Sequence, residues 1–246
     1  NPLFNTYLAV NNVATSFYDV KNFQLINTTQ KDTLFFRTEF EGGREHDDKY
    51  NFNFYHTFNK ESKSVIGLKT SDINFKGNKW LINKNGDKKN KVIVNKTLDS
   101  IFISEIVMSN GVNEEIRLKG QLADSTYKDL SLQFKIVSLD KIMPEVENLA
   151  LEGEINGKLN ILQKNGGYLP SCNLTFDRFG VNDSILGDLS IGIVGNRNLS
   201  NFVVETHLID DKVEKFSVLG NISNENDEQI ANLLVNFYRR VTKALI

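Results

Sequence analysis

Hydrophobic and polar residues alternate along most of this chain. In LEGEINGKLNI, residues 151–161, charged residues and asparagines separate six positions that are apolar or glycine. These six positions are Leu151, Gly153, Ile155, Gly157, Leu159 and Ile161. Because successive side chains of a strand point to opposite faces, the pattern predicts a strand with one apolar and one polar face.

The same alternation recurs in many other segments. Residues 34–40 place Phe36 between Leu34 and Thr38 on one face, and residues 50–58 place Phe52, Phe54 and Phe58 on one face. Similar segments follow to about residue 225, separated by turns rich in glycine, asparagine and aspartate. Buried parallel strands would read as continuous apolar runs instead. The pattern therefore predicts an all-β protein, an elongated and curled antiparallel sheet that forms a hydrophobic trough.

Glycines interrupt the apolar face at regular places. Gly153 and Gly157 lie within the alternating segment above, and Gly120, Gly195 and Gly220 occur in a similar spacing. Glycine weakens a strand and leaves its surface unfilled. Either the backbone bends at these positions, or something other than a side chain occupies the space. In a curled sheet we expect glycines to let the strand coil and to leave room above the backbone.

The last twenty-one residues have a different pattern. From residue 226, apolar residues recur at helical spacing. They are Ile230, Leu233, Leu234, Phe237, Val241 and Leu245. This spacing predicts an amphipathic helical tail over 226–246, after a continuous sheet segment over 1–225 that could subdivide near residue 100. Leu233, Val235 and Phe237 also alternate, so one more strand is the rival interpretation.

Composition removes several classes of function. The 29 basic and 31 acidic residues nearly balance, which gives no indication of nucleic-acid binding. The single cysteine, Cys172, excludes an internal disulfide framework and a cysteine-based zinc cluster. The three histidines have no metal-ligand spacing, and no phosphate loop, nucleophile elbow or dinucleotide fingerprint is present. We therefore expect no catalytic residues, no metal, no cofactor and no enzyme activity.

Several of these segments resemble a known family. Residues 127–176, with the LEGEINGKLNI strand and the QKNGGYLP turn, and GDLSIGIVG at 187–195 carry the resemblance. So do residues 32–83, which run from DTLFFRTEFEGG to NKWLIN. Over about residues 30–225 the chain is similar to the TamB-type translocation and assembly module proteins, relatives of the AsmA-like envelope proteins. These motifs are β patterns, not catalytic signatures.

The resemblance implies a periplasmic segment of a protein anchored in the inner membrane of a Gram-negative cell. Its β-sheet would curl into a trough, a "β-taco", with an apolar interior. Its implied partners are phospholipid acyl chains and an outer-membrane barrel protein of the assembly-module type. The implied roles are phospholipid transport between the membranes and assembly of outer-membrane proteins. The family's membrane anchor would lie outside this chain, which we take to be an internal fragment.

The apolar faces of the strands give the expected lining of the groove. The lining residues are Phe36, Phe52, Phe54, Phe58, Leu118, Leu151, Gly153, Ile155, Gly157, Leu159, Ile161, Ile191, Ile193 and Val218. Two other functions are compatible with the same pattern. One is a β-sandwich module that binds or adheres to protein or carbohydrate, and the other is an exposed sheet edge that templates strands of nascent outer-membrane proteins.

Overall fold

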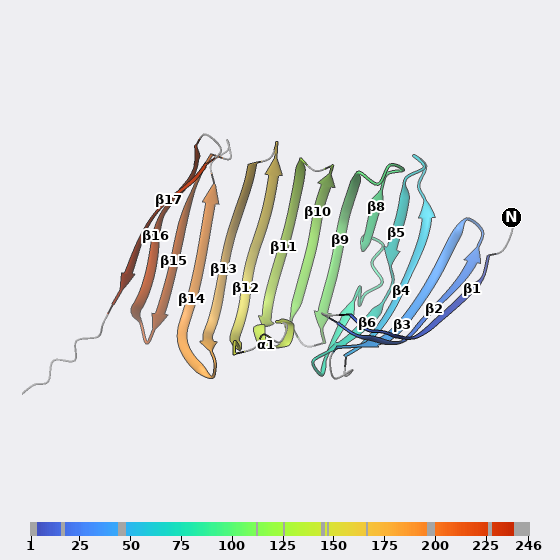
Figure 1. The fold of residues 1–246 in the computed structure, drawn as a ribbon, viewed down its shortest axis with the longest axis horizontal. Coiled ribbons are helices and arrows are strands. Elements are labelled where there is room, and N and C mark those ends of the chain that lie inside the picture. Colours follow the sequence, from blue (N-terminus) through green and yellow to red (C-terminus); the bar gives the residue numbers. More distant parts are fainter. Residues whose placement is uncertain are drawn as a thin grey trace, which may run out of the picture. The chain divides into compact units, whose positions relative to one another are not determined.

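A computed structural model describes residues 4–15, 18–43, 48–111, 113–124, 126–143, 146, 148–165, 167–195, 200–225 and 228–238. Within these ranges the chain forms seventeen strands and one short helix (Figure 1). The paired strands run antiparallel. The predicted all-β class, an antiparallel and curled sheet, is confirmed.

The chain divides into two compact units, residues 1–135 and residues 136–246. The boundary falls within β11, later than residue 100, which begins β9. The first unit contains β1 (Thr6–Val13), β2 (Val20–Gln30), β3 (Thr33–Gly42), β4 (Asp48–Phe58), β5 (Ser64–Leu68), β6 (Ser71–Phe75), β7 (Asn78–Ile82), β8 (Lys91–Val94), β9 (Ser100–Asn110), β10 (Glu115–Ala123) and most of β11 (Tyr127–Ser138).

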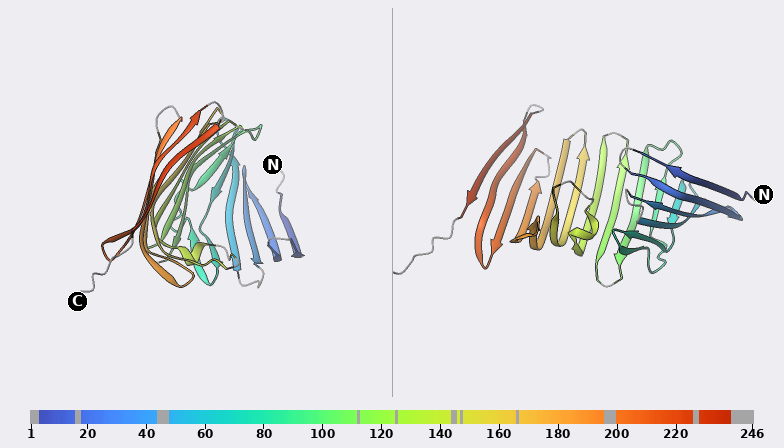
Figure 2. Two further views of the ribbon diagram at one scale, coloured as in Figure 1. Left: turned by 60° about the vertical axis from the view of Figure 1, so that its left-hand side comes forward. Right: turned by 60° about the horizontal axis from the view of Figure 1, so that its bottom comes forward.

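The first unit is a meander that forks in its middle. Strands β1 to β4 pair in order, and then β4 pairs with β5 along one half and with β6 along the other. Strand β5 leads to β8, and β6 leads to β7. Both branches meet again on β9, which pairs with β10. Within this unit the strand direction changes strongly between β9 and β1, so the sheet is bent (Figure 2).

The second unit is a regular meander. It contains α1 (Leu139–Ile142), β12 (Leu151–Lys164), β13 (Gly167–Val181), β14 (Ser184–Gly195), β15 (Asn201–Asp210), β16 (Val213–Glu225) and β17 (Glu228–Phe237). Each strand from β12 to β17 pairs with the next one along the chain. Helix α1 packs against β12.

The C-terminal segment is a strand over 228–237, so the predicted helix is wrong there and the rival interpretation is confirmed. Leu233, Val235 and Phe237 are paired with Gly220, Val218 and Phe216 of β16. The rings of Phe216 and Phe237 lie 5.1 Å apart. The ladder bonds with β16 fix a period of two, which outweighs the helical spacing of the same apolar residues. Val241 and Leu245 lie outside the described residues.

Few apolar side chains are buried in the described residues. They are Val65, Trp80, Ile82, Val137, Leu139, Ile155, Cys172 and Phe202. A sheet packed on both faces would bury most of its apolar residues. Here most of them are half-buried instead, which directs attention to the apolar face of each unit.

Candidate apolar binding face

The apolar face of the first unit is most aromatic on β3 and β4. Phe36 stacks on Phe54 with ring centroids 4.8 Å apart, and Phe40 stacks on Tyr50 at 4.5 Å. Phe52 lies beside them, 6.2 Å from Phe40. These contacts follow from the register, because Phe36 is paired with Phe54 and Phe40 with Tyr50 on neighbouring strands. The predicted residues Phe36, Phe52 and Phe54 are thus brought together.

The same face continues across β9, β10 and β11. Leu118 is paired with Ile106 on one side and with Leu132 on the other. Gly120 is paired with Ile103 and Leu130, so it belongs to this face as well. Residues paired directly across an antiparallel sheet share a face. The aliphatic part of the first unit's apolar face therefore lies on these three strands.

The apolar face of the second unit is built in the same way. Ile155, Gly157 and Leu159 are paired with Phe176, Leu174 and Cys172. The face then continues through Ile191 and Ile193 of β14 to Val218 of β16 and Val235 of β17.

The exposure of the predicted lining residues shows how open these faces are. Ile155 is 5% exposed and Phe58 is 63% exposed. The other twelve predicted lining residues are half-buried. Side chains covered by a second protein layer would be buried. Within each unit, these residues therefore keep apolar surface available to a ligand.

Sequence reasoning missed the part of the face that lies on β1 and β2. Leu8 and Val10 of β1 are paired with Leu25 and Phe23 of β2. The Phe23 ring lies 6.2 Å from that of Phe40 and extends the aromatic cluster. The signal was present in the alternation of Phe23 and Leu25, but asparagines and threonines around it hide the strand.

The glycines of the apolar face have a backbone cause. At Gly157, where φ is +117°, an added Cβ would lie 2.0 Å from the carbonyl oxygen of Asn173. The same contact occurs at Gly120 with Asp129 O at 2.0 Å, and at Gly220 with Asn232 O at 2.1 Å. A neighbouring backbone, not open space, therefore excludes a side chain at these positions. The expectation that these glycines leave room above the backbone does not explain their occurrence.

A polar cluster closes one end of the aromatic face. The Tyr18 hydroxyl lies 2.7 Å from that of Tyr50 and donates to Asp48 Oδ2 at 3.2 Å. Burial is the main cause that raises the pKa of Tyr18, and the neighbouring Tyr50 and Asp48 add to it. Gly42 makes room for the Tyr18 ring, since an added Cβ would lie 2.3 Å from the Tyr18 hydroxyl oxygen. The cluster ties the segment before β2 to β4.

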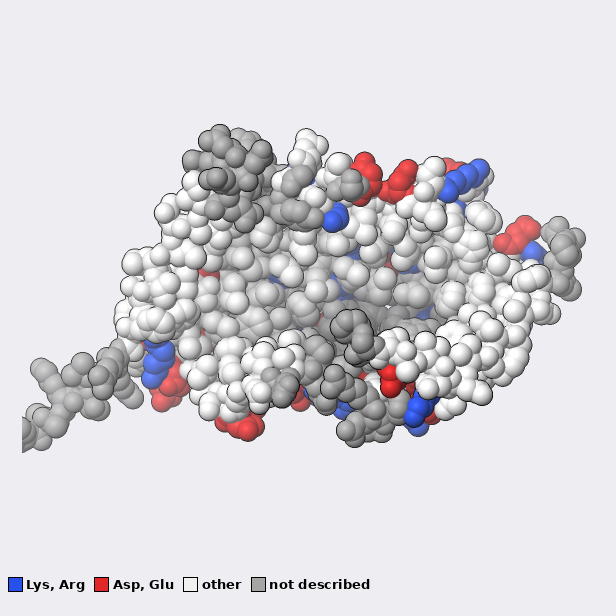
Figure 3. Space-filling model, in the orientation of Figure 1, with Lys and Arg blue, Asp and Glu red and all other residues white. Residues whose placement is uncertain are grey.

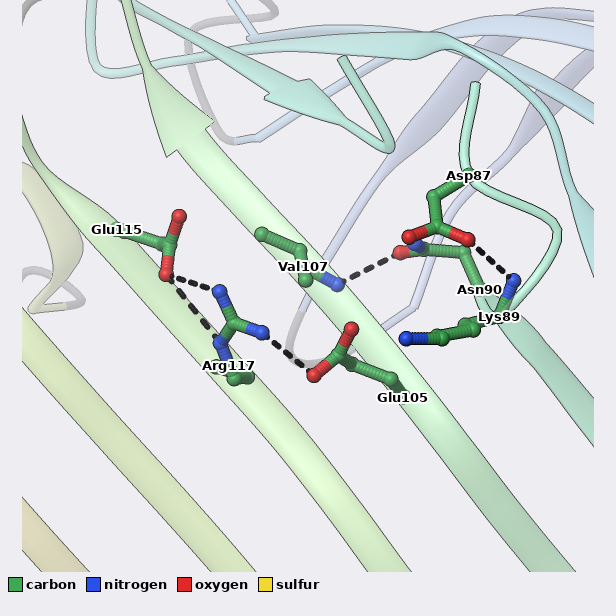
Figure 4. A network of polar contacts seen from close by, with 7 residues as sticks. All are labelled: Asp87, Lys89, Asn90, Glu105, Val107, Glu115 and Arg117. Carbon is green, nitrogen blue, oxygen red and sulfur yellow. Dashed lines mark hydrogen bonds and ion pairs between the residues drawn. The ribbon is translucent and has the colours of Figure 1, made fainter. Parts of the chain in front are cut away.

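The opposite face carries the charged residues. On β9 and β10, Arg117 binds Glu105 at 2.5 Å and Glu115 at 2.7 Å (Figure 4). On β15 and β16, both ring nitrogens of His207 contact carboxylates, Glu214 at 2.5 Å and Glu205 at 2.9 Å. These hydrogen bonds raise the pKa of His207, with Glu214 as the largest cause. On the face seen in Figure 3, charged residues gather along the strand ends and the surface between them is mainly uncharged.

Three further features would bear on function in the described residues: metal ligands, a reactive cysteine and a membrane-spanning helix. No three His, Cys, Asp or Glu side chains with described positions group as metal ligands. Cys172 is buried on the apolar face, and burial raises the pKa of its thiol. None of the helices in the described ranges has the length and apolarity needed to cross a membrane.

No family model, curated protein or solved structure matches the chain.

Proposed function

We propose that this chain is a periplasmic segment of a TamB-type or AsmA-like envelope protein and that its apolar face binds phospholipid acyl chains. In this proposal the chain takes part in phospholipid transport between the membranes or in outer-membrane protein assembly. It would belong to a protein anchored in the inner membrane, with an outer-membrane barrel protein as partner. The observation that carries the proposal is the half-buried state of twelve of the fourteen lining residues.

The energetic argument starts from the cost of apolar surface in water. Covering such surface yields about 25 cal/mol per Å². An acyl chain gains about 0.8 kcal/mol for each CH₂ group that leaves water. Burying even a few CH₂ groups against Leu159, Ile191 or Ile193 would therefore be favourable. A lining without charged groups also gives a bound acyl chain little preference for one position, which suits a lipid that has to move along the face.

Two adjacent residues of β14 provide a matched test. Ile193 is half-buried on the apolar face, whereas Val194 is 68% exposed on the opposite face. A benzoylphenylalanine crosslinker at position 193 should capture phospholipid in cells, and one at position 194 should capture little. In parallel, Ile193→Asp should lower the phospholipid recovered by mass spectrometry from gently extracted protein, whereas Val194→Asp should leave it unchanged.

The crosslinking arm keeps the test decisive, because it places no charge on the apolar face. Circular dichroism of both aspartate variants checks that the strands remain. Gently extracted protein without phospholipid, or equal crosslinking at the two positions, would contradict the proposal.

The β-sandwich alternative predicts that the same residues are more deeply buried. A sandwich packs a second sheet against the apolar face at protein-like density. That packing would bury Phe36, Phe52 and Phe54 within the unit, yet these three rings are half-buried. Their exposure favours the acyl-chain proposal.

A further inference from the structure

A second concave site lies on the opposite face of the first unit. A pocket of about 670 Å³ opens between β3, β4 and the loop that joins β7 to β8. Phe35 and Tyr55 form one wall, and both alternate with residues of the apolar face, so they point to the other side of the sheet. Pockets of about 300–1,000 Å³ are the usual size for small-molecule sites. The pocket is therefore separate from the apolar binding face.

The aromatic wall is fixed in place. The Tyr55 ring lies directly over Gly67, where an added Cβ would be 2.0 Å from the ring. Phe35 packs beside it, with centroids 6.3 Å apart. The ammonium of Lys69 lies 4.2 Å from the centre of the Phe35 ring. An apolar surface and a positive charge thus meet in one pocket.

The loop that joins β7 to β8 faces this wall and is held in place by hydrogen bonds at both of its ends. Asn83 Oδ1 accepts from the backbone N–H of Asp87 at 2.7 Å, and its Nδ2 donates to Leu68 O at 2.7 Å. At the other end, Asn90 Oδ1 accepts from the N–H of Val107 at 2.8 Å (Figure 4). Asn83 and Asn90 are each 3% exposed. Two buried amides therefore anchor a loop whose residues between them are exposed.

This loop places Lys88 at the pocket, across from the aromatic wall. Neither Lys69 nor Lys88 forms an ion pair with a residue in the described part of the chain. Thr33 and Asn53 add a hydroxyl and an amide to the lining. Asp87 also lines the pocket, so the two lysines leave one net positive charge there. Ammonium groups beside an aromatic wall match a ligand that is apolar at one end and acidic at the other.

We propose that this pocket binds a small anion with an apolar body, such as an aromatic phosphate or carboxylate. The aromatic body would pack on Phe35 and Tyr55, and the acidic group would accept hydrogen bonds from Lys69 and Lys88. The site uses none of the residues of the acyl-chain proposal, so either proposal can fail alone.

The test measures the binding of a probe, 1-naphthyl phosphate, to the whole chain by isothermal titration calorimetry. We expect saturable one-to-one binding, and weaker binding of the neutral analogue 1-naphthol. The double variant Lys69→Gln/Lys88→Gln should bind about tenfold more weakly or worse, because charge-assisted hydrogen bonds are lost. The control Lys79→Gln/Lys96→Gln removes the same charge from exposed lysines outside the pocket and should bind within about twofold of the unmodified chain.

Two further arms locate the bound probe and its natural source. Ile193→Asp, on the apolar face of the other unit, should leave naphthyl phosphate binding unchanged. Displacement of the probe by dihexanoyl phosphatidic acid below its micelle concentration would identify a lipid headgroup as the acid, and no displacement would identify a free anion; both results support the site. Absence of saturable binding, equal binding of 1-naphthol, or equal loss in the two double variants would overturn it.

Discussion

Replacing Gly157 by alanine should destabilise the second unit strongly. At this position φ is +117°, a conformation that L-residues rarely adopt. The added Cβ would also lie 2.0 Å from Asn173 O and 3.1 Å from the Cα of Leu174. Both atoms belong to the backbone of β13, so no side-chain rotation can relieve the contact. Strands β12 and β13 would have to separate locally.

The expected size of the effect combines two costs. Holding a residue with a Cβ in this backbone region costs about 1–3 kcal/mol. Forcing an extra carbon into a filled space typically costs about 1–3 kcal/mol more. The free energy of unfolding should therefore fall by about 2–6 kcal/mol. For a protein of this size, that loss corresponds to a melting temperature lower by about 5–20 °C.

Gly192 provides the matched control on β14. It lacks a positive φ, and an added Cβ there would lie 3.7 Å from the nearest atom, Glu205 O, an ordinary contact. Gly192→Ala should therefore be neutral or stabilise by about 0.4–1 kcal/mol, since alanine restricts the unfolded chain. Urea denaturation followed by circular dichroism measures both variants.

The comparison separates two explanations of the glycines. If they existed to leave the groove open, a methyl group at Gly157 would enter empty space and the fold would tolerate it. Equal stability of Gly157→Ala and Gly192→Ala would therefore refute the backbone explanation.

Three other perturbations test the polar contacts that support the sheet. Gly42→Ala should displace the Tyr18 ring and lower the free energy of unfolding, measured by urea denaturation, by about 2–3 kcal/mol. Tyr18→Phe loses only hydrogen bonds and should lower it by about 1 kcal/mol. Equal losses in the two variants would contradict the role of the ring. Arg117→Met should lower the free energy of unfolding by about 1–2 kcal/mol at neutral pH, because Glu105 and Glu115 then repel each other. Adding Glu115→Gln should restore part of this loss. A double variant no more stable than Arg117→Met would refute the repulsion. The pKa of His207 is raised on folding, so its contribution to stability should be full below its unfolded pKa of about 6.5 and should fade as the pH rises through the folded pKa. The stability difference between the unmodified chain and His207→Gln should therefore shrink with rising pH, and a difference that grows would contradict it.

Alternation alone was enough to predict the β class and most of the strands. Residues 33–42 and 151–161 mostly keep a period of two, with Phe35 as an exception, because one face is mainly polar and the other mainly apolar. The segments β1 and β2 were missed because their polar faces extend into the apolar one: Asn27 is buried on the same face as Leu25. The C-terminal strand was predicted as a helix because its apolar residues satisfy both periods, and only pairing with β16 decides between them.

The candidate site was predictable only in part, for a related reason. A face of a strand can be assigned from one segment, and so the apolar face of most strands could be predicted. The pocket at Phe35 and Tyr55 could not, because it depends on the fork between β4 and β9 and on a loop anchored by Asn83 and Asn90. Long-range pairing of this kind leaves no local pattern. In the sequence, the loop reads only as a polar turn.

The recurring glycines connect the sequence pattern to the curl of the sheet. Gly120, Gly157 and Gly220 are each paired with a leucine: Leu130, Leu174 and Leu233, respectively. In all three cases the atom that an added Cβ would strike first is the carbonyl oxygen just before that leucine. The same close backbone contact therefore occurs in both units, each time on the apolar face, with a positive φ at Gly120 and Gly157 but not at Gly220. Close approach of two backbones at such points increases the local coiling of the strands. The glycines thus shape the apolar face through the backbone, and the leucines and isoleucines beside them, half-buried at Leu130 and Leu174 and exposed at Leu233, supply its contact surface.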